Sequence, residues 1–298
     1  MRGLTHGFIS GYSGQNVRSV FKFEPMEHLG MRISSFVVVF FYLASSLGNG
    51  FDLSNALRGE HTYEQYYQVQ NDGTDQVFLL NWLYYQDVQY TPPEKYKRTE
   101  HFGGWIQDPT NQTCFDVRGM VLVRQALQPV KIDDRNQCRI DSASWYDPYS
   151  DEYFYLASDL QIDHLVPLKN AYLAGAWEWS NAKRCHYGNF LSDPLHLIAV
   201  QKHANLSKGD RGPDMYMPLN SQFQCQYLAI WLKIKAVWNL KIAVPEASAI
   251  QSFLQENSCP GELFYLSQQE LTELQEQTEN IPSACHHLQF VETQTLVH

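Results

Sequence analysis

The chain has 298 residues, of which 44% are hydrophobic and 14% aromatic, and its formal net charge at pH 7 is −10. This is the composition of a globular protein with ample material for a core, in one large or two modest domains, and it excludes a disordered chain of low hydrophobicity. The acidic balance by itself gives no indication of a nucleic-acid partner, because phosphate backbones are bound by basic surfaces.

The N-terminal region predicts export. Residues 1–30 show no clear periodicity and are interpreted as an upstream extension or leader, with Met31 as the true start. Residues 31–48 join a basic start to a short apolar core and a small-residue exit, which is typical of a signal peptide. The apolar run is short for a membrane span, and a signal anchor is the alternative. We therefore expect a secreted or periplasmic protein that has left the membrane after signal cleavage.

Six cysteines support this compartment. All of them follow residue 48, and an even number in an oxidising compartment suggests disulfides, with reduced buried thiols as the alternative. Many pairings are possible, and we expect Cys114 to pair with Cys138 because both border the same predicted strand region. The other four are Cys185, Cys225, Cys259 and Cys285.

The region before the central motif is predicted to be mostly packing. Residues 49–91 are rich in Tyr and Gln and carry no chemical signature, and Pro92-Pro93 marks a boundary. Two strands are expected over 138–145 and 153–156, joined by a turn over 147–151 whose Asp, Pro and Ser residues favour chain reversal.

One stretch in the middle of the chain organises the rest. Residues 160–164 predict a short strand that ends in Asp163-His164. Residues 195–200 predict a second strand, followed by a polar helical segment that carries Asn205. The expected order is therefore strand, strand, helix.

The polar residues of this unit suit one kind of chemistry. Asp163 and Asn205 offer two hard oxygen ligands, and a magnesium ion needs only one or two protein oxygens together with substrate phosphate. The imidazole of His164 titrates near neutrality and can take a proton from a water that attacks phosphorus. A divalent cation stabilises charge on the phosphate and the leaving oxygen. Together these features predict metal-assisted hydrolysis of phosphodiesters.

These residues resemble the HNH, or ββα-metal, endonuclease family, and most closely its secreted bacterial branch. The resemblance rests on the order and spacing of three sequence elements. It implies an α+β fold in which a ββα-metal core is surrounded by helices and a β-hairpin. The elements are Asp163-His164-Leu165-Val166-Pro167, His196, and Asn205-Leu206-Ser207-Lys208-Gly209-Asp210.

The resemblance also implies a role for each residue. His164 would be the general base, and Asp163 and Asn205 would hold the divalent metal, Mg²⁺ with Mn²⁺ as the alternative. His196 stands where the family usually has an Asn that supports the loop between the two strands, and an imidazole can also donate and accept hydrogen bonds. The implied substrate is DNA, with RNA as an alternative.

Five basic residues are candidate phosphate contacts. Lys208 and Arg211 follow the metal-site Asn, where positive charge could hold a phosphodiester. Lys183 and Arg184 form a basic pair that we expect to be exposed. Arg118 lies in a Cys-x-x-x-Arg element that the family also shows upstream of its metal site. For each of them, a solvated surface position or an ion pair is the alternative.

Three helices are expected around and after the motif. Residues 169–180 and 222–240 show helical spacing of apolar residues, and Pro245 is interpreted as the end of the second helix. A capping-box pattern at Ser267 opens a third helix that continues to about Glu279.

Charge differs between the motif and the C-terminus. Residues 157–241 contain nine Lys or Arg and six Asp or Glu, whereas 242–298 contain eight Glu and no Asp, Lys or Arg. We therefore divide the mature chain into an HNH nuclease domain over 49–245 and an acidic extension over 246–298. The extension is a candidate for an intramolecular contact that restrains the site, and an inhibitor is a candidate partner.

Two other functions stay open. One is a catalytically decayed, exported nucleic-acid-binding protein, in which His196 marks the loss of activity. The other is a disulfide-stapled envelope protein whose aromatic surface meets a protein partner. A lone Asp-His pair is commonly structural, so the endonuclease prediction rests on the joint order of the motif. Asn205-Leu206-Ser207 is also a glycosylation pattern, and a sugar there would block metal binding.

Overall fold

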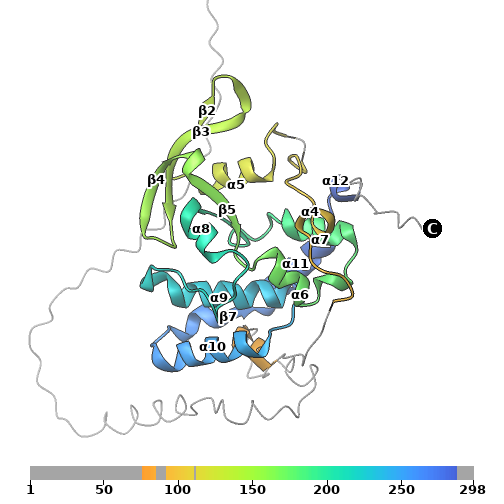
Figure 1. The fold of residues 1–298 in the computed structure, drawn as a ribbon, viewed down its shortest axis with the longest axis vertical. Coiled ribbons are helices and arrows are strands. Elements are labelled where there is room, and N and C mark those ends of the chain that lie inside the picture. Colours follow the sequence, from red (N-terminus) through yellow and green to blue (C-terminus); the bar gives the residue numbers. More distant parts are fainter. Residues whose placement is uncertain (1–75, 85–91, 111, 287–298) are drawn as a thin grey trace, which may run out of the picture. The chain divides into compact units, whose positions relative to one another are not determined.

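The computed structural model describes residues 76–84, 92–110 and 112–286 (Figure 1). Four predicted segments therefore lie wholly or largely outside the described residues. They are the leader over 1–30, the signal peptide over 31–48, most of the Tyr- and Gln-rich segment over 49–91, and the end of the acidic extension over 287–298.

The described chain is α+β, as the sequence predicts. Its strands form three small sheets in which every pair is antiparallel, and no parallel pair occurs among these strands. The sheets are β1 (Gln76–Phe78) with β7 (Tyr265–Ser267), then β2 (Lys131–Asp133), β3 (Asn136–Asp147) and β4 (Glu152–Leu156), and finally β5 (Leu160–His164) with β6 (Leu197–Gln201).

Helices make up the rest of the regular structure. None of those described is long and apolar enough to cross a membrane. In chain order they are η1 (Leu79–Tyr84), α4 (Arg98–His101), α5 (Val117–Gln125), η2 (Ala157–Asp159), α6 (Leu168–Leu173), η3 (Ala176–Glu178), α7 (Asn181–Gly188), α8 (Lys202–Lys208), α9 (Ser221–Val237), α10 (Val244–Glu256), η4 (Gly261–Phe264), α11 (Gln268–Glu279) and α12 (Ser283–His286).

The predicted hairpin is confirmed as β3 and β4. Its turn is fixed by Asp147, a fully buried residue whose carboxylate accepts hydrogen bonds from the Tyr149 amide at 2.9 Å and the Ser150 hydroxyl at 2.7 Å. Asp151 adopts a φ of 62°, which the short polar side chain of Asp tolerates. The turn therefore points Tyr149 inward, towards the strand that follows.

The expected order of strand, strand and helix is present as β5, β6 and α8. The two strands pair with Asp163 opposite Ile198 and His164 opposite Leu197, and α8 packs against both of them. The Gln201 side chain caps the first turn of α8 by accepting from the Ala204 amide at 2.8 Å.

The β5–β6 pair separates two hydrophobic clusters. On one face, Leu160 and Ile162 pack into a cluster with α5 and β3. On the other face, Ile198 and Val200 of β6 join the larger cluster, which is built around α9. Side chains alternate between the two faces of a strand, so burial on both sides fixes the register of the pair.

Two of the helix predictions need correction. The helix expected over 169–180 stops at Leu173, because Gly175 adopts a φ of 124° and only a short 3₁₀ turn follows. Pro245 does not end the preceding helix, since α9 already stops at Val237. It lies in the first turn of α10, where its missing N–H costs no hydrogen bond. The capping box is confirmed: the Ser267 side chain accepts from the Glu270 amide.

The described part of the acidic extension, 246–286, is not a separate body. Its apolar residues Ile250, Phe264 and Leu271 belong to the same cluster as α9. Two disulfides, Cys225–Cys259 and Cys185–Cys285, join it to α9 and α7. The predicted Cys114–Cys138 pair is also confirmed.

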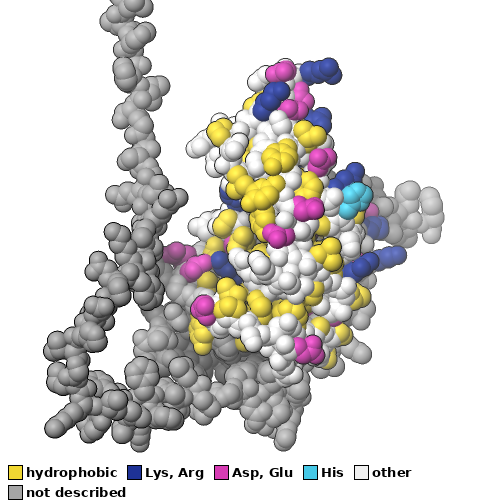
Figure 2. All heavy atoms as spheres, turned by 90° about the vertical axis from the view of Figure 1, so that its left-hand side faces the viewer, with side chains coloured by type: hydrophobic (Ala, Val, Ile, Leu, Met, Phe, Trp, Pro, Cys, Tyr) yellow, Lys and Arg dark blue, Asp and Glu magenta, His cyan; other side chains and the backbone are white. Residues whose placement is uncertain are grey.

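One side of the molecule is notably aromatic. Figure 2 shows the side that carries β3 and β4, where hydrophobic side chains lie among scattered charged ones. Tyr153, Tyr155 and Leu156 of β4 are each at least half exposed, and the Tyr146 ring of β3 contacts the Tyr153 ring in a tilted arrangement at a centroid distance of 5.4 Å.

We expect the Cys185–Cys285 disulfide to contribute more stability than Cys114–Cys138. It closes a loop of 100 residues rather than 24, which alone favours it by about 1 kcal/mol, and Cys185 is fully buried. The measurement is the free energy of unfolding in urea for the two double Cys→Ala variants. An equal or smaller loss for the 185–285 variant would contradict this ranking.

Candidate active site

A cleft of about 300 Å³ opens beside the end of β5. It brings together Asp163, His164 and Asn205, which the sequence places on two separate elements. The remaining lining residues come from the segment around α4, from β5, from the start of α6 and from the end of α8. They are Tyr96, Arg98, Gln161, Ile162, Pro167, Leu168, Lys169, Leu206, Gly209 and Asp210.

Asp163 is buried and both of its carboxylate oxygens are hydrogen-bonded. Lys208 donates to Oδ1 at 2.8 Å, and the hydroxyl of Tyr149 donates to Oδ2 at 2.6 Å. Burial raises the pKa of Asp163, and the Lys208 charge opposes this shift. The Asp163 carboxylate is therefore committed to an internal pair, although each of its oxygens keeps a further lone pair that could accept from another group.

The prediction that Lys208 contacts phosphate is wrong. Its side chain has no solvent exposure, and its ammonium also donates to the His164 carbonyl at 3.0 Å. Burial lowers the pKa of Lys208, while the Asp163 charge acts in the opposite direction. Lys208 points inward because it lies on the face of α8 that packs against β5.

His164 is held as a neutral base. Its Nε2 lies 2.9 Å from the Gly188 carbonyl, which can only accept, so Nε2 carries the proton and Nδ1 carries the lone pair. No described residue hydrogen-bonds to Nδ1. The ring stacks on Trp105 with an interplanar angle of 2°. Burial lowers the pKa of His164 to about 3, partly offset by the Gly188 carbonyl.

His164 and Asn205 lie on opposite faces of β5. His164 lies on the same face as Ile162, whereas Asp163 lies on the face of Gln161, against which α8 packs. On that face the Asn205 Nδ2 donates to the Gln161 side chain at 2.9 Å. The side-chain Oδ1 of Asn205 is then left as an acceptor. The three side chains meet at one cleft, but not as one cluster on one face.

No group of three or more His, Cys, Asp or Glu side chains that could hold a metal ion is found in the described part of the chain. A cation in this cleft would therefore depend on the amide oxygen of Asn205, on Asp163 shared with Lys208, and on water or substrate oxygens. Magnesium is the ion that accepts so few protein ligands.

His196 is buried beside the site. Its Nε2 donates to the Tyr187 carbonyl at 2.8 Å, and its own carbonyl accepts from the Leu165 amide at 3.2 Å. Leu165 directly follows His164, so His196 is placed where it supports the end of β5. Its Nδ1 is buried and has no partner among the described residues.

Two further phosphate-contact predictions are wrong. Arg118 donates to the carbonyls of Ala157 and Leu160, both at 3.1 Å, and so holds the chain just before β5. Arg184 is buried rather than exposed, and its guanidinium donates to backbone carbonyls, including that of His101 at 3.0 Å, and to the Asn181 side chain. Neither arginine lines the cleft.

The other two basic candidates lie outside the cleft. Lys183 pairs with Glu279 of the acidic extension and lies over the Trp179 ring. Arg211 is exposed but does not line the cleft. The described residues of the acidic extension contact Lys183 through Glu279, but none of them lines the cleft.

Two cationic residues of the cleft were missed by the sequence analysis, Arg98 and Lys169. Lys169 pairs with Asp210. Arg98 follows the Pro92-Pro93 boundary in a short basic run, with no motif or periodicity to single it out. Only the fold brings it next to His164.

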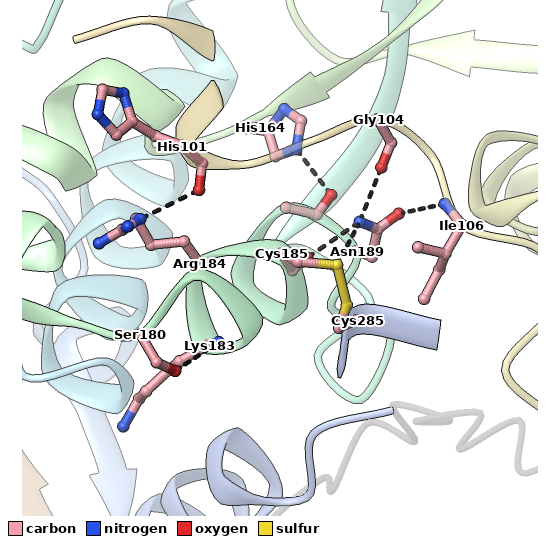
Figure 3. The surroundings of a disulfide bond; sticks show 11 residues. His101, Gly104, Ile106, His164, Ser180, Lys183, Arg184, Cys185, Asn189 and Cys285 are labelled. Atoms are coloured by element: carbon pink, nitrogen blue, oxygen red, sulfur yellow. Dashed lines mark hydrogen bonds between the residues drawn. A yellow bond between two sulfur atoms is a disulfide. The ribbon is translucent and has the colours of Figure 1, made fainter. Parts of the chain in front are cut away.

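Helix α7 positions both sides of the site (Figure 3). Its last residue, Gly188, accepts from His164, and Asn189 then binds the loop that carries Trp105. The side-chain Oδ1 of Asn189 accepts from the Ile106 amide at 3.0 Å, and the Nδ2 of the same side chain donates to the Gly104 carbonyl at 3.1 Å. The Trp105 ring is thereby held against the face of His164.

Lys208→Met is expected to destabilise the protein by about 3 kcal/mol, because it leaves the buried Asp163 carboxylate without its cation. Lys202→Met is the matched control: it removes an exposed Lys from the same helix and should cost less than about 0.5 kcal/mol. Urea unfolding of both variants measures the difference. Similar losses for the two would mean that the buried pair does not have this role.

His196 should make stability depend on pH. Burial lowers the pKa of His196 to about 4, whereas an unfolded His titrates near 6.5. The hydrogen bond to the Tyr187 carbonyl and the Asp193 charge oppose this shift, and His186 and Arg124 add to it. The unfolded state then binds more protons between these values, so its contribution is present above about pH 6.5 and falls by about 3 kcal/mol towards pH 4.

We therefore expect His196→Asn to lose less stability than the wild type when the pH falls from neutral to about 4. An Asn can still donate to the Tyr187 carbonyl but does not titrate. Urea midpoints at both pH values measure this change. An unaltered pH dependence in the variant would contradict the assignment.

Comparison with known proteins gives one informative result. No family model matches the chain, and no solved structure gives a significant match. An uncharacterized secreted protein of the fungus Arthroderma benhamiae is 38% identical over 168 residues, which cover 56% of this chain and 78% of that protein.

This relative bears on compartment rather than on chemistry. It is secreted, and together with the three disulfides it confirms the prediction that this chain is secreted. It is fungal, so it gives no support to a bacterial origin for the motif. With more than three quarters of the relative covered at this identity, the chain belongs to the same family as this uncharacterized secreted protein.

Proposed function

We propose that this secreted protein is a metal-dependent endonuclease of the HNH type that hydrolyses phosphodiester bonds in DNA, with RNA as a further substrate. His164 is the general base, and Asn205 and Asp163 are the ligands of a Mg²⁺ or Mn²⁺ ion. His196 supports the site from the loop between the strands.

The observation that carries the proposal is the state of His164. The Nε2 proton is donated to the Gly188 carbonyl, and His164 lines the cleft. The lone pair on Nδ1 is therefore the one that can accept a proton. The low pKa keeps the ring neutral at physiological pH, which a general base requires. A phosphate anion in the cleft would raise this pKa and strengthen the base, because negative charge favours the protonated ring.

The placement of the base and the ligands on opposite faces of β5 agrees with this chemistry. Phosphodiester hydrolysis by in-line attack puts the nucleophilic water and the leaving oxygen on opposite sides of phosphorus. A base on one side and a cation site on the other therefore suit the reaction better than a single cluster would. The opposite faces of β5 on which His164 and Asn205 lie therefore support the proposal.

The donor set fits a weakly held, largely hydrated cation. Asn205 offers a neutral oxygen, and Asp163 offers lone pairs that it shares with Lys208. When bound, such an ion stabilises negative charge on the phosphate and the leaving oxygen. The nearby Lys208 ammonium repels a cation at Asp163, which is a further reason to expect weak binding of the ion.

His164→Ala should lower the rate of plasmid DNA cleavage by a factor of at least about 10², the smallest effect typical of a lost general base. The matched control is His203→Ala, an exposed His on α8 that should cleave normally. EDTA should stop the wild type, and added Mg²⁺ should restore it. Near-normal turnover by His164→Ala, or no cleavage by wild type with any divalent cation, would overturn the proposal.

The exposed aromatic face of β3 and β4 favours one alternative, an exported interaction protein. Tyr153 and Tyr155 present two rings on the same side of β4. This function would need neither a cation nor nucleic acid. Wild-type protein that binds neither DNA nor Mn²⁺ would favour it, and a decayed nuclease would instead bind DNA without cleaving it.

A further inference from the structure

Arg98 is a cationic residue at the cleft. It lines the cleft with Tyr96 and His164, and it is exposed. Its side chain makes no hydrogen bond or ion pair with any residue that the structure describes. The other two cations nearby are already paired, Lys169 with Asp210 and Lys208 with Asp163.

The short helix that carries Arg98 is firmly held. Its last residue, His101, contacts the Tyr172 ring at a centroid distance of 4.5 Å, and its Nδ1 lies 2.9 Å from the Lys97 backbone. The His101 carbonyl accepts from Arg184 of α7 at 3.0 Å (Figure 3). Because α7 also supplies the carbonyl that holds His164, one helix fixes the position of Arg98 relative to the base.

Arg98 and His164 line the same cleft. A positive charge beside a neutral base, with no described anion paired to it, favours an anion between the two. A guanidinium suits phosphate in particular, because its planar fork can donate two parallel hydrogen bonds to a pair of oxygens.

We propose that Arg98 binds the phosphodiester group that enters this cleft, donating to its non-bridging oxygens while His164 faces the attacking water. The proposal rests on the proposed function and deepens it, since it assigns the phosphate contact to a residue outside the strand, strand, helix motif. It replaces the role that the sequence analysis gave to Lys208, Arg118 and Arg184.

The test measures DNA binding in Mg²⁺, in the His164→Ala background so that the substrate stays intact. Fluorescence anisotropy of a labelled short duplex gives the affinity at several salt concentrations between about 50 and 200 mM. Adding Arg98→Ala should weaken binding roughly tenfold near 0.1 M salt and reduce the slope of log K against log salt by about 0.9, the value for one lost phosphate contact. Arg98→Lys should keep most of the slope.

Lys97→Ala is the matched control. It removes the same charge one residue earlier, from an exposed side chain that pairs with Glu100 and does not line the cleft, so the slope should stay at the background value. If Arg98→Ala and Lys97→Ala behave alike on DNA that the background protein binds, the assignment of Arg98 fails and the nuclease proposal stands. If the background protein binds no DNA at any of these salt concentrations, both fail.

Discussion

The contact on which the site depends is the buried ion pair between Lys208 and Asp163. Lys208 ends α8, Asp163 lies near the end of β5, and Tyr149 reaches the same carboxylate from the turn between β3 and β4. Three elements thus meet at two oxygens. Removing two charges from water costs several kcal/mol for each ion, so the pair adds less to net stability than its short distance suggests. Its main effect is to fix the end of β5, and with it His164.

The Lys208–Asp163 ion pair also aligns Asn205 with β5. Asn205 and Lys208 are three residues apart on α8 and therefore lie on one face of the helix, while Gln161 and Asp163 are two apart on β5 and lie on one face of the strand. Each helical residue bonds to one of the strand residues. The other face of β5 is fixed separately, because α7 ends at the carbonyl that holds His164 and is tied to α12 by a disulfide.

The sequence predicted the elements of this site better than the use of its charges. Short apolar runs indicated β5 and β6, and the polar helix after them followed from its composition. Whether Lys208, Arg118 or Arg184 faces solvent depends on distant carboxylates and carbonyls, which no local pattern reveals. Pro245 was misinterpreted because proline follows helix ends and also occupies helix starts. Arg98 could not be found, since only the packing of α4 against α7 brings it to the cleft.

The net charge of −10 bears on the proposed nucleic-acid substrate, because that substrate is a polyanion. In the described part of the extension, Glu270 and Glu279 pair with Lys233 and Lys183, so acidic residues here neutralise cations away from the cleft. At physiological ionic strength a charge is screened over about 8 Å, so the field at the cleft is set by its own lining more than by the sum over the chain. There the Lys208–Asp163 and Lys169–Asp210 pairs are each neutral. The Arg98 guanidinium therefore gives an acidic protein a cleft that is locally attractive to phosphate.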